Sequence, residues 1–236
     1  PLVRFSACLA VGELRLSEAK SQLLELSRES QPSVRVAVLF ALHRIGDTHM
    51  SRDLEFASID PSPNVRSNTA MVLGMLGEPT ATRVLAPMLH DSNAAVRMAA
   101  ATALWRLGDR RGLDQLAAGT ISGYPDDQMM ALLGLASTHD QRVLGNLQGA
   151  LTGDYQEVCL VAARACGMVG SDVGYGVALI GAKSSDPRQR MLAALALGDI
   201  RRTDAQPVLS GLLKDFDPDV RVAAAVAPPP IREARP

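Results

Sequence analysis

A dipeptide that returns at a fixed interval constrains this chain more than any other feature. The dipeptide is Val-Arg; the first three of the four steps between its five occurrences are 31 residues each, and the last equals four such intervals. It occurs at Val3-Arg4, Val34-Arg35, Val65-Arg66, Val96-Arg97 and Val220-Arg221. Self-similarity at a period of about 20–50 residues is typical of solenoids and propellers, in which each repeat packs on its neighbours. The period therefore predicts an array of stacked units.

Each 31-residue unit contains the pattern of two helices joined by a turn. In the fourth unit Val96, Ala100, Leu104 and Leu107 are spaced as one face of an α-helix, which we call the first helix of the unit. Glycine then suits a left-handed turn, and it stands there at Gly46, Gly77, Gly108 and Gly170. A second apolar face follows and predicts the second helix, with Leu23, Leu54, Leu85, Leu116, Leu147, Ala178 and Leu209.

The unit boundaries carry helix-start signals. Asp186-Pro187 and Asp217-Pro218 place an N-capping carboxylate before a proline in the first turn. The units are expected to start near residues 1, 31, 62, 93, 124, 155, 186 and 217. We therefore expect a single solenoid over 1–227, with seven helix pairs and the first helix of an eighth, and a Pro-rich tail or linker over 228–236.

The residues of these units resemble HEAT-like repeats. Asp217-Pro218-Asp219-Val220-Arg221 carries the opening of the motif, and Leu107-Gly108-Asp109 carries its turn. At 31 residues the unit is shorter than the common HEAT length of about 40–47. It looks like the short subclass first named from phycobilisome lyases, which is widespread in bacteria. The resemblance implies an all-α, right-handed α-solenoid of about seven and a half repeats.

The resemblance also implies roles for the repeated residues. The repeated arginines are expected to be structural and to bond across units: Arg35, Arg66, Arg97, Arg190 and Arg221. In the family the second helix usually lines the concave surface, and the first helix forms the convex one. The expected concave lane comprises Arg52, Glu55, Arg83, Asp114, Gln148 and Tyr175. Its mixed charge suits a protein partner better than a nucleic-acid backbone, and simple solvation of a helix face is the alternative.

Composition and motifs give no sign of an enzyme, a metal site or a cofactor. The net charge of −1 does not favour nucleic acid, and no run of 18 apolar residues predicts a membrane span. The three cysteines are too few for a disulfide framework. The segment from Gly176 to Lys183 has one residue too many for a phosphate-binding loop, and the four histidines form no His-Glu pair of the kind that ligates iron in the HEAT-like hydroxylases.

Several residues interrupt the repeat. More than half of the 19 glycines lie within 119–185, in the fifth and sixth units, which indicates either drift or a close-approach groove for a partner backbone. Trp105 stands where other units have glycine, and either packs locally or anchors a ligand. Tyr124 and Tyr155 lie one period apart in inter-repeat turns, where structural caps are favoured over a ligand site.

Together these patterns predict a protein-binding scaffold or interaction module that forms part of a longer bacterial protein. The alternatives are an accessory subunit of a bilin lyase-type enzyme and a purely architectural spacer. A monomer is favoured, and so is a cytoplasmic location. The identity of the partner does not follow from the sequence.

Overall fold

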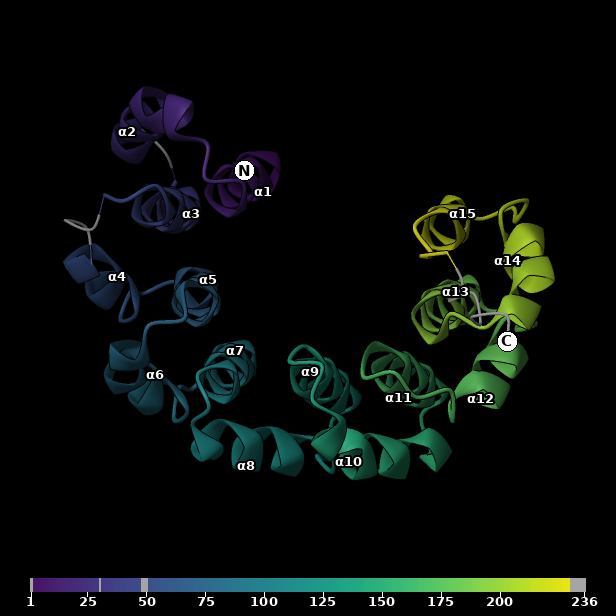
Figure 1. Ribbon diagram of the computed structural model, residues 1–236. Coiled ribbons are helices and arrows are strands. Elements are labelled where there is room, and N and C mark those ends of the chain that lie inside the picture. Colours follow the sequence, from purple (N-terminus) through teal and green to yellow (C-terminus); the bar gives the residue numbers. More distant parts are fainter. Residues whose placement is uncertain (1, 30, 48–50, 230–236) are drawn as a thin grey trace, which may run out of the picture. The chain divides into compact units, whose positions relative to one another are not determined.

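The computed structural model describes residues 2–29, 31–47 and 51–229, and these form 15 α-helices with no strand. The chain divides into two compact units, residues 1–115 and 116–236. Each unit is a stack of antiparallel helix pairs (Figure 1). The prediction of an all-α solenoid is confirmed. The expectation of one domain over 1–227 stays a prediction, and most of the expected tail, 230–236, lies outside the described residues.

The first helices of the pairs begin one residue after the expected unit starts. In unit 1 they are α1 (Leu2–Glu13), α3 (Pro32–Arg44), α5 (Pro63–Leu76) and α7 (Ala94–Arg106). In unit 2 they are α9 (Pro125–Ala136), α11 (Gln156–Met168), α13 (Pro187–Ile200) and α15 (Pro218–Ala225). Proline is the first residue of α3, α5, α9, α13 and α15, where its nitrogen needs no hydrogen-bond partner. The Asp217 carboxylate caps α15 by accepting hydrogen bonds from the amides of Asp219 and Val220.

The second helices are shorter and complete the pairs. They are α2 (Lys20–Glu29), α4 (Ser51–Ala57), α6 (Thr82–Met88), α8 (Arg110–Gly119), α10 (Leu144–Gly149), α12 (Tyr175–Gly181) and α14 (Gln206–Leu212). The glycine turns that lead to them are left-handed as expected, with φ between 76° and 98° at Gly46, Gly77, Gly108 and Gly170. A side chain is rarely stable at such φ values, so glycine explains the short turns.

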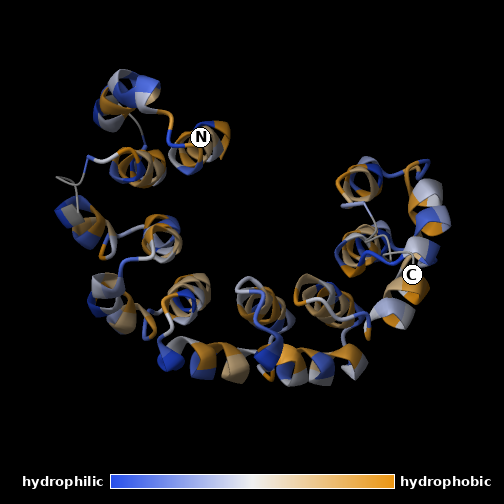
Figure 2. Ribbon diagram, in the orientation of Figure 1, coloured by the Kyte–Doolittle hydropathy of each residue, from blue (hydrophilic) through white to orange (hydrophobic). Residues whose placement is uncertain are grey.

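The core of each unit lies between the two rows of helices. In unit 1, Leu85 of α6 is fully buried in one cluster with Phe40 of α3 and Leu104 of α7. In unit 2, Leu160 of α11 and Leu197 of α13 belong to a second cluster. Burying a leucine contributes about 1.5–3 kcal/mol, so these leucines stabilise each pair on its neighbours. The helices carry both hydrophobic and hydrophilic residues (Figure 2), and in a repeat array each pair buries its apolar surface against its neighbours.

Glycines in the first helices let successive first helices pack very closely. A Cβ built on Gly167 of α11 would lie 2.7 Å from the backbone of Asp199 in α13, and one on Gly74 of α5 would lie 2.7 Å from Ala103 in α7. In unit 2, Gly174 also brings its backbone against Ala163. These glycines of the Gly-rich segment therefore serve packing inside the protein. Gly145, Gly149 and Gly176 face open space instead.

This difference between glycines predicts opposite effects of the same substitution. Gly167→Ala should destabilise the protein by about 1–3 kcal/mol because its methyl group meets backbone that cannot move aside. Gly176→Ala should be neutral or stabilising by up to about 1 kcal/mol because the helix gains a better former without a clash. Thermal unfolding followed by circular dichroism compares the two variants. Equal melting temperatures for both variants would contradict the packing role of Gly167.

Candidate functional site

All six residues of the expected concave lane lie on second helices. Arg52 and Glu55 are on α4, Arg83 on α6, Asp114 on α8, Gln148 on α10 and Tyr175 on α12. Within each unit the first helices pack directly on one another, and the second helices pack against this row (Figure 1). Small residues of the first helices allow this close packing. The expectation that the second helices line a concave surface stays a prediction.

The lane residues differ in their surroundings. Arg83 and Glu55 are exposed and form a long ion pair of 3.9 Å between α6 and α4. Asp114 pairs with Arg110 one turn earlier at 3.7 Å, and Gln148 is exposed. Exposed pairs of this kind contribute little to stability, so these side chains remain available to a partner.

Tyr175 is held within unit 2 instead. The guanidinium of Arg202 lies 4.4 Å from its ring centre and also bonds Asp172 at 2.8 Å and Asp204 at 2.9 Å. Burial, followed by the hydrogen bond with Asp204, raises the pKa of Tyr175. Tyr175 is therefore engaged by neighbours of its own unit.

Two of the repeated arginines form a contact that we call the clamp. Arg66 donates two hydrogen bonds to the carboxylate of Asp91, at 2.7 and 2.8 Å, and a third to the carbonyl of Asp60 at 2.8 Å. Arg190 does the same with the carboxylate of Asp215, at 2.7 and 2.8 Å, and with the carbonyl of Ser184 at 3.0 Å. Each guanidinium thus joins the loop before its own helix to the loop after the next second helix.

The other repeated arginines make part of this contact or none of it. Arg97 and Arg221 donate hydrogen bonds to the carbonyls of Asp91 and Asp215, each at 2.8 Å. Arg35 is exposed, and within the described part of the chain no hydrogen bond or ion pair joins it to Asp60, its counterpart to Asp91. The clamp is therefore closed at Arg66 and Arg190 but open at Arg35.

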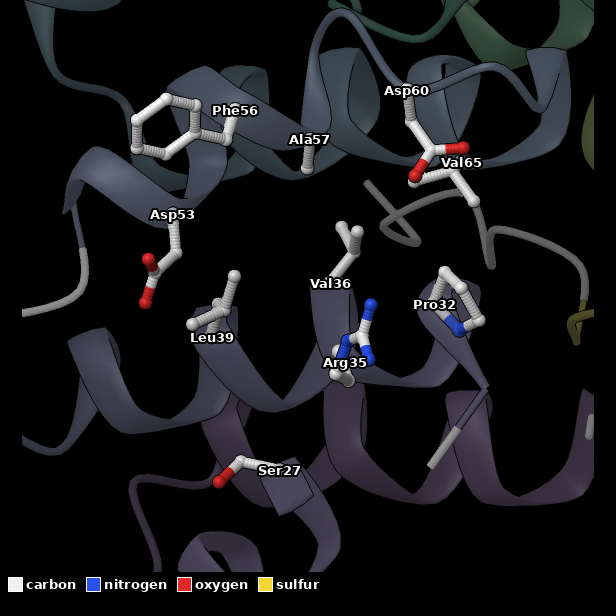
Figure 3. Close-up of a pocket in the computed structure, with 10 residues that line it drawn as sticks. All are labelled: Ser27, Pro32, Arg35, Val36, Leu39, Asp53, Phe56, Ala57, Asp60 and Val65. Carbon is white, nitrogen blue, oxygen red and sulfur yellow. The ribbon is translucent and has the colours of Figure 1, made fainter. Parts of the chain in front are cut away.

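Adjacent pockets lie beside α4 in unit 1. The first has a volume of about 380 Å³, with Val36, Leu39 and Val65 among its apolar lining and Arg35, Asp53 and Asp60 as its charged groups (Figure 3). The second, of about 550 Å³, lies one repeat further along and is lined by Asp60, Arg66, Val84, Met88 and Asp91, among others. The two pockets share Asp60, so they form one continuous surface.

Two large apolar side chains are exposed on this surface. Phe56, at the end of α4, is 70% exposed and lines the first pocket. Ile59, in the loop that follows, is 77% exposed and lines the second pocket. Sequence analysis missed both residues, because a single Phe or Ile near a helix end fits the amphipathic pattern of any second helix. We call Phe56, Ile59 and the two pockets the α4 surface.

Other residues singled out in the sequence lie apart from the α4 surface. Trp105 on α7 is half-buried. Tyr124 and Tyr155 precede α9 and α11 with exposed side chains that make no capping hydrogen bond. The thiols Cys8, Cys159 and Cys166 are free and buried, and burial raises the pKa of Cys166 to about 11.

Among the described residues no cluster of His, Cys, Asp and Glu could hold a metal ion. No helix in this part of the chain is long and apolar enough to cross a membrane.

The clamp predicts an acid-dependent loss of stability. The hydrogen bonds from Arg190 lower the pKa of Asp215 to about 2 from 3.8. A carboxyl with a lowered folded-state pKa stabilises the fold above its unfolded pKa, and this contribution is lost as the pH falls from about 4 through about 2. Asp215→Asn should therefore lower stability at pH 7 and reduce its decline below pH 4. Urea unfolding at several pH values measures both effects.

Asp154→Asn is the control for that experiment, because it removes an exposed carboxylate of the same unit. If Asp215→Asn and Asp154→Asn had the same acid dependence as the wild type, the clamp would not contribute to it.

Comparison with known proteins supports the repeat architecture. Residues 53–127 match the family model for HEAT repeats. No curated protein is similar enough in sequence to match the chain. The complex of CpcE and CpcF of phycocyanin lyase from Nostoc sp. PCC7120 is 21% identical with a TM-score of 0.54, over 87% of this chain and 92% of that chain. Human deoxyhypusine hydroxylase in complex with glycerol is 16% identical with a TM-score of 0.41, over 96% of both chains. Residues 53–127 are thus similar to HEAT repeats, and the chain has an all-α solenoid fold.

Proposed function

We propose that this protein is a scaffold or interaction module that binds a protein partner through the α4 surface. The observation that carries the proposal is the exposure of Phe56 and Ile59 beside two adjacent pockets. Aromatic and aliphatic anchors next to pockets are typical of the central residues of protein interfaces. Isolated exposed apolar residues are common, but here they border the same continuous surface.

The charges of the α4 surface support a protein partner. Carboxylates and guanidinium groups alternate there, with Glu55 and Asp60 beside Arg66 and Arg83. A nucleic-acid backbone would favour a cluster of cations without nearby carboxylates. The mixed charges fit the polar rim of a protein interface around an apolar centre. Of the expected lane, Arg52, Glu55 and Arg83 thus keep their proposed role in binding, on the second helices α4 and α6.

Loss of the apolar anchors should strongly weaken binding. Phe56→Asp combined with Ile59→Asp should reduce capture of the partner from an extract of the source cells at least tenfold, because a buried anchor contributes about 2 kcal/mol or more. Affinity capture with quantitative mass spectrometry measures the proteins that the wild type retains and the variant loses. Ile180→Asp is the matched control, since Ile180 is the equivalent of Phe56 in unit 2 and is also 70% exposed.

A charge-reversal variant locates the edge of the interface. Arg52→Glu with Arg83→Glu should weaken capture by a smaller factor than the loss of the anchors, because rim charges mainly affect the rate of association. If the anchor variant and the wild type retained the same proteins in equal amounts, the α4 surface would not be the binding site.

The similarity in fold to the phycocyanin lyase complex favours one other function, that of an accessory subunit of a bilin lyase-type enzyme. A protein of that kind should retain a tetrapyrrole when it is produced in cells that make one. Visible absorbance of the purified protein measures this. Absorbance that persists through gel filtration would support the lyase-type role over binding of protein alone, and a colourless protein would exclude it. A purely architectural spacer is the remaining alternative, and it predicts no specific capture by either route.

A further inference from the structure

We propose that Asp60 is the binding site for an arginine side chain of the partner. The inference rests on the proposed function, because it assigns the chemistry by which the first pocket of the α4 surface recognises a partner. It starts from a comparison of three equivalent loops in the same chain. These loops contain Asp60, Asp91 and Asp215, which follow α4, α6 and α14.

The three loops are built in the same way. The carboxylate of Asp60 accepts a hydrogen bond from the amide of Ser62 at 2.8 Å. The carboxylates of Asp91 and Asp215 accept the equivalent bonds from Asn93 and Asp217, each at 2.9 Å. In every case an arginine six residues later also donates to the carbonyl of the aspartate at 2.8 Å. The loop of Asp60 is therefore held in the conformation of the other two.

Only one part of the contact differs between these loops. Asp91 and Asp215 each receive two hydrogen bonds from an arginine that lies 25 residues earlier. The equivalent residue for Asp60 is Arg35, and no hydrogen bond or ion pair between them occurs in the described part of the chain. Asp60 thus has the geometry that binds a guanidinium elsewhere in this protein, without the guanidinium that its repeat would supply.

The first pocket has further features that favour a guanidinium. Relative to the second pocket it has Asp53 in place of Val84 and Phe56 in place of Pro87. Figure 3 shows both carboxylates on the α4 side of the pocket, and Arg35 on α3. The pocket has two carboxylates and only one arginine, so its charge favours a bound cation. The aromatic ring of Phe56 can also stack on a planar guanidinium. A carboxylate ligand would instead be repelled by Asp53 and Asp60.

A small compound tests the site without knowledge of the partner. N-acetyl-arginine amide should cause saturable shifts of the Ser62 amide and its neighbours in nitrogen-15 NMR spectra of the full chain. The neutral analogue N-acetyl-citrulline amide has the same shape and should cause none. N-acetyl-lysine amide should bind at least several-fold more weakly, because an ammonium group cannot make two parallel hydrogen bonds to one carboxylate. Equal shifts from the citrulline or lysine compound would overturn the proposal.

Variants of the pocket locate the effect. Asp60→Asn should weaken binding of the arginine compound about tenfold or more, as expected for loss of hydrogen bonds to a charged group. Asp53→Asn should weaken it by a smaller factor. Arg35→Met should preserve or strengthen binding, because it removes the competing cation of the chain itself. Unchanged affinity in Asp60→Asn, or loss of binding in Arg35→Met, would refute the assignment. Amide spectra with unchanged dispersion verify that each variant is folded.

The two proposals fail in different ways. If capture of the partner depends on Phe56 and Ile59 but the arginine and citrulline compounds behave alike, the interface stands and the arginine site is wrong. If the arginine compound binds as expected but the anchor variant captures the same proteins as the wild type, the site stands and the proposed interface is wrong.

Discussion

At two places in this protein a guanidinium shared between two loops fixes neighbouring helix pairs against each other. Arg66 and Arg190 each bind the loop before their own helix and the carboxylate of the loop that follows the next second helix. A bidentate arginine–carboxylate contact is strong and directional, so it fixes both distance and orientation. The carboxylate of Asp91 also accepts a hydrogen bond from a backbone amide of its own loop. The next repeated arginine, Arg97, donates a hydrogen bond to the carbonyl of Asp91. These hydrogen bonds hold each loop in one conformation before any partner binds. The pockets between the loops are therefore held in shape as well.

Close packing of the first helices is the second constraint. Van der Waals contact at Gly74 and Gly167 leaves no room for a side chain, so the first helices form the tighter row of each unit. The second helices pack mainly against the first helices and not against one another. Phe56, at the end of a second helix, and Ile59, in the loop that follows, are exposed.

Most of the fold could be predicted from the 31-residue period. Apolar spacing located the helices, and prolines and glycines located their ends, because each of these residues has a local backbone preference that neighbours do not override. The close packing of the first helices could not be predicted from periodicity, because it depends on side-chain volume at contacts between helices, such as Gly167 of α11 with Asp199 of α13. The open clamp at Arg35 could not be predicted from the sequence either. Val34-Arg35 has the same letters as Val65-Arg66, and only the position of the guanidinium relative to Asp60 distinguishes them.

The direction of the clamp gives the array a fixed order. Each contact runs forward along the chain, from an arginine to an aspartate 25 residues later. Deletion of one 31-residue segment directly after Arg66 would place Ser122 at that distance, and serine cannot bind both arms of a guanidinium. Units that look alike in sequence are therefore not interchangeable. Gain or loss of a unit therefore changes the number and position of the clamps along the chain, and Arg97, which has Ser122 25 residues later, already lacks one.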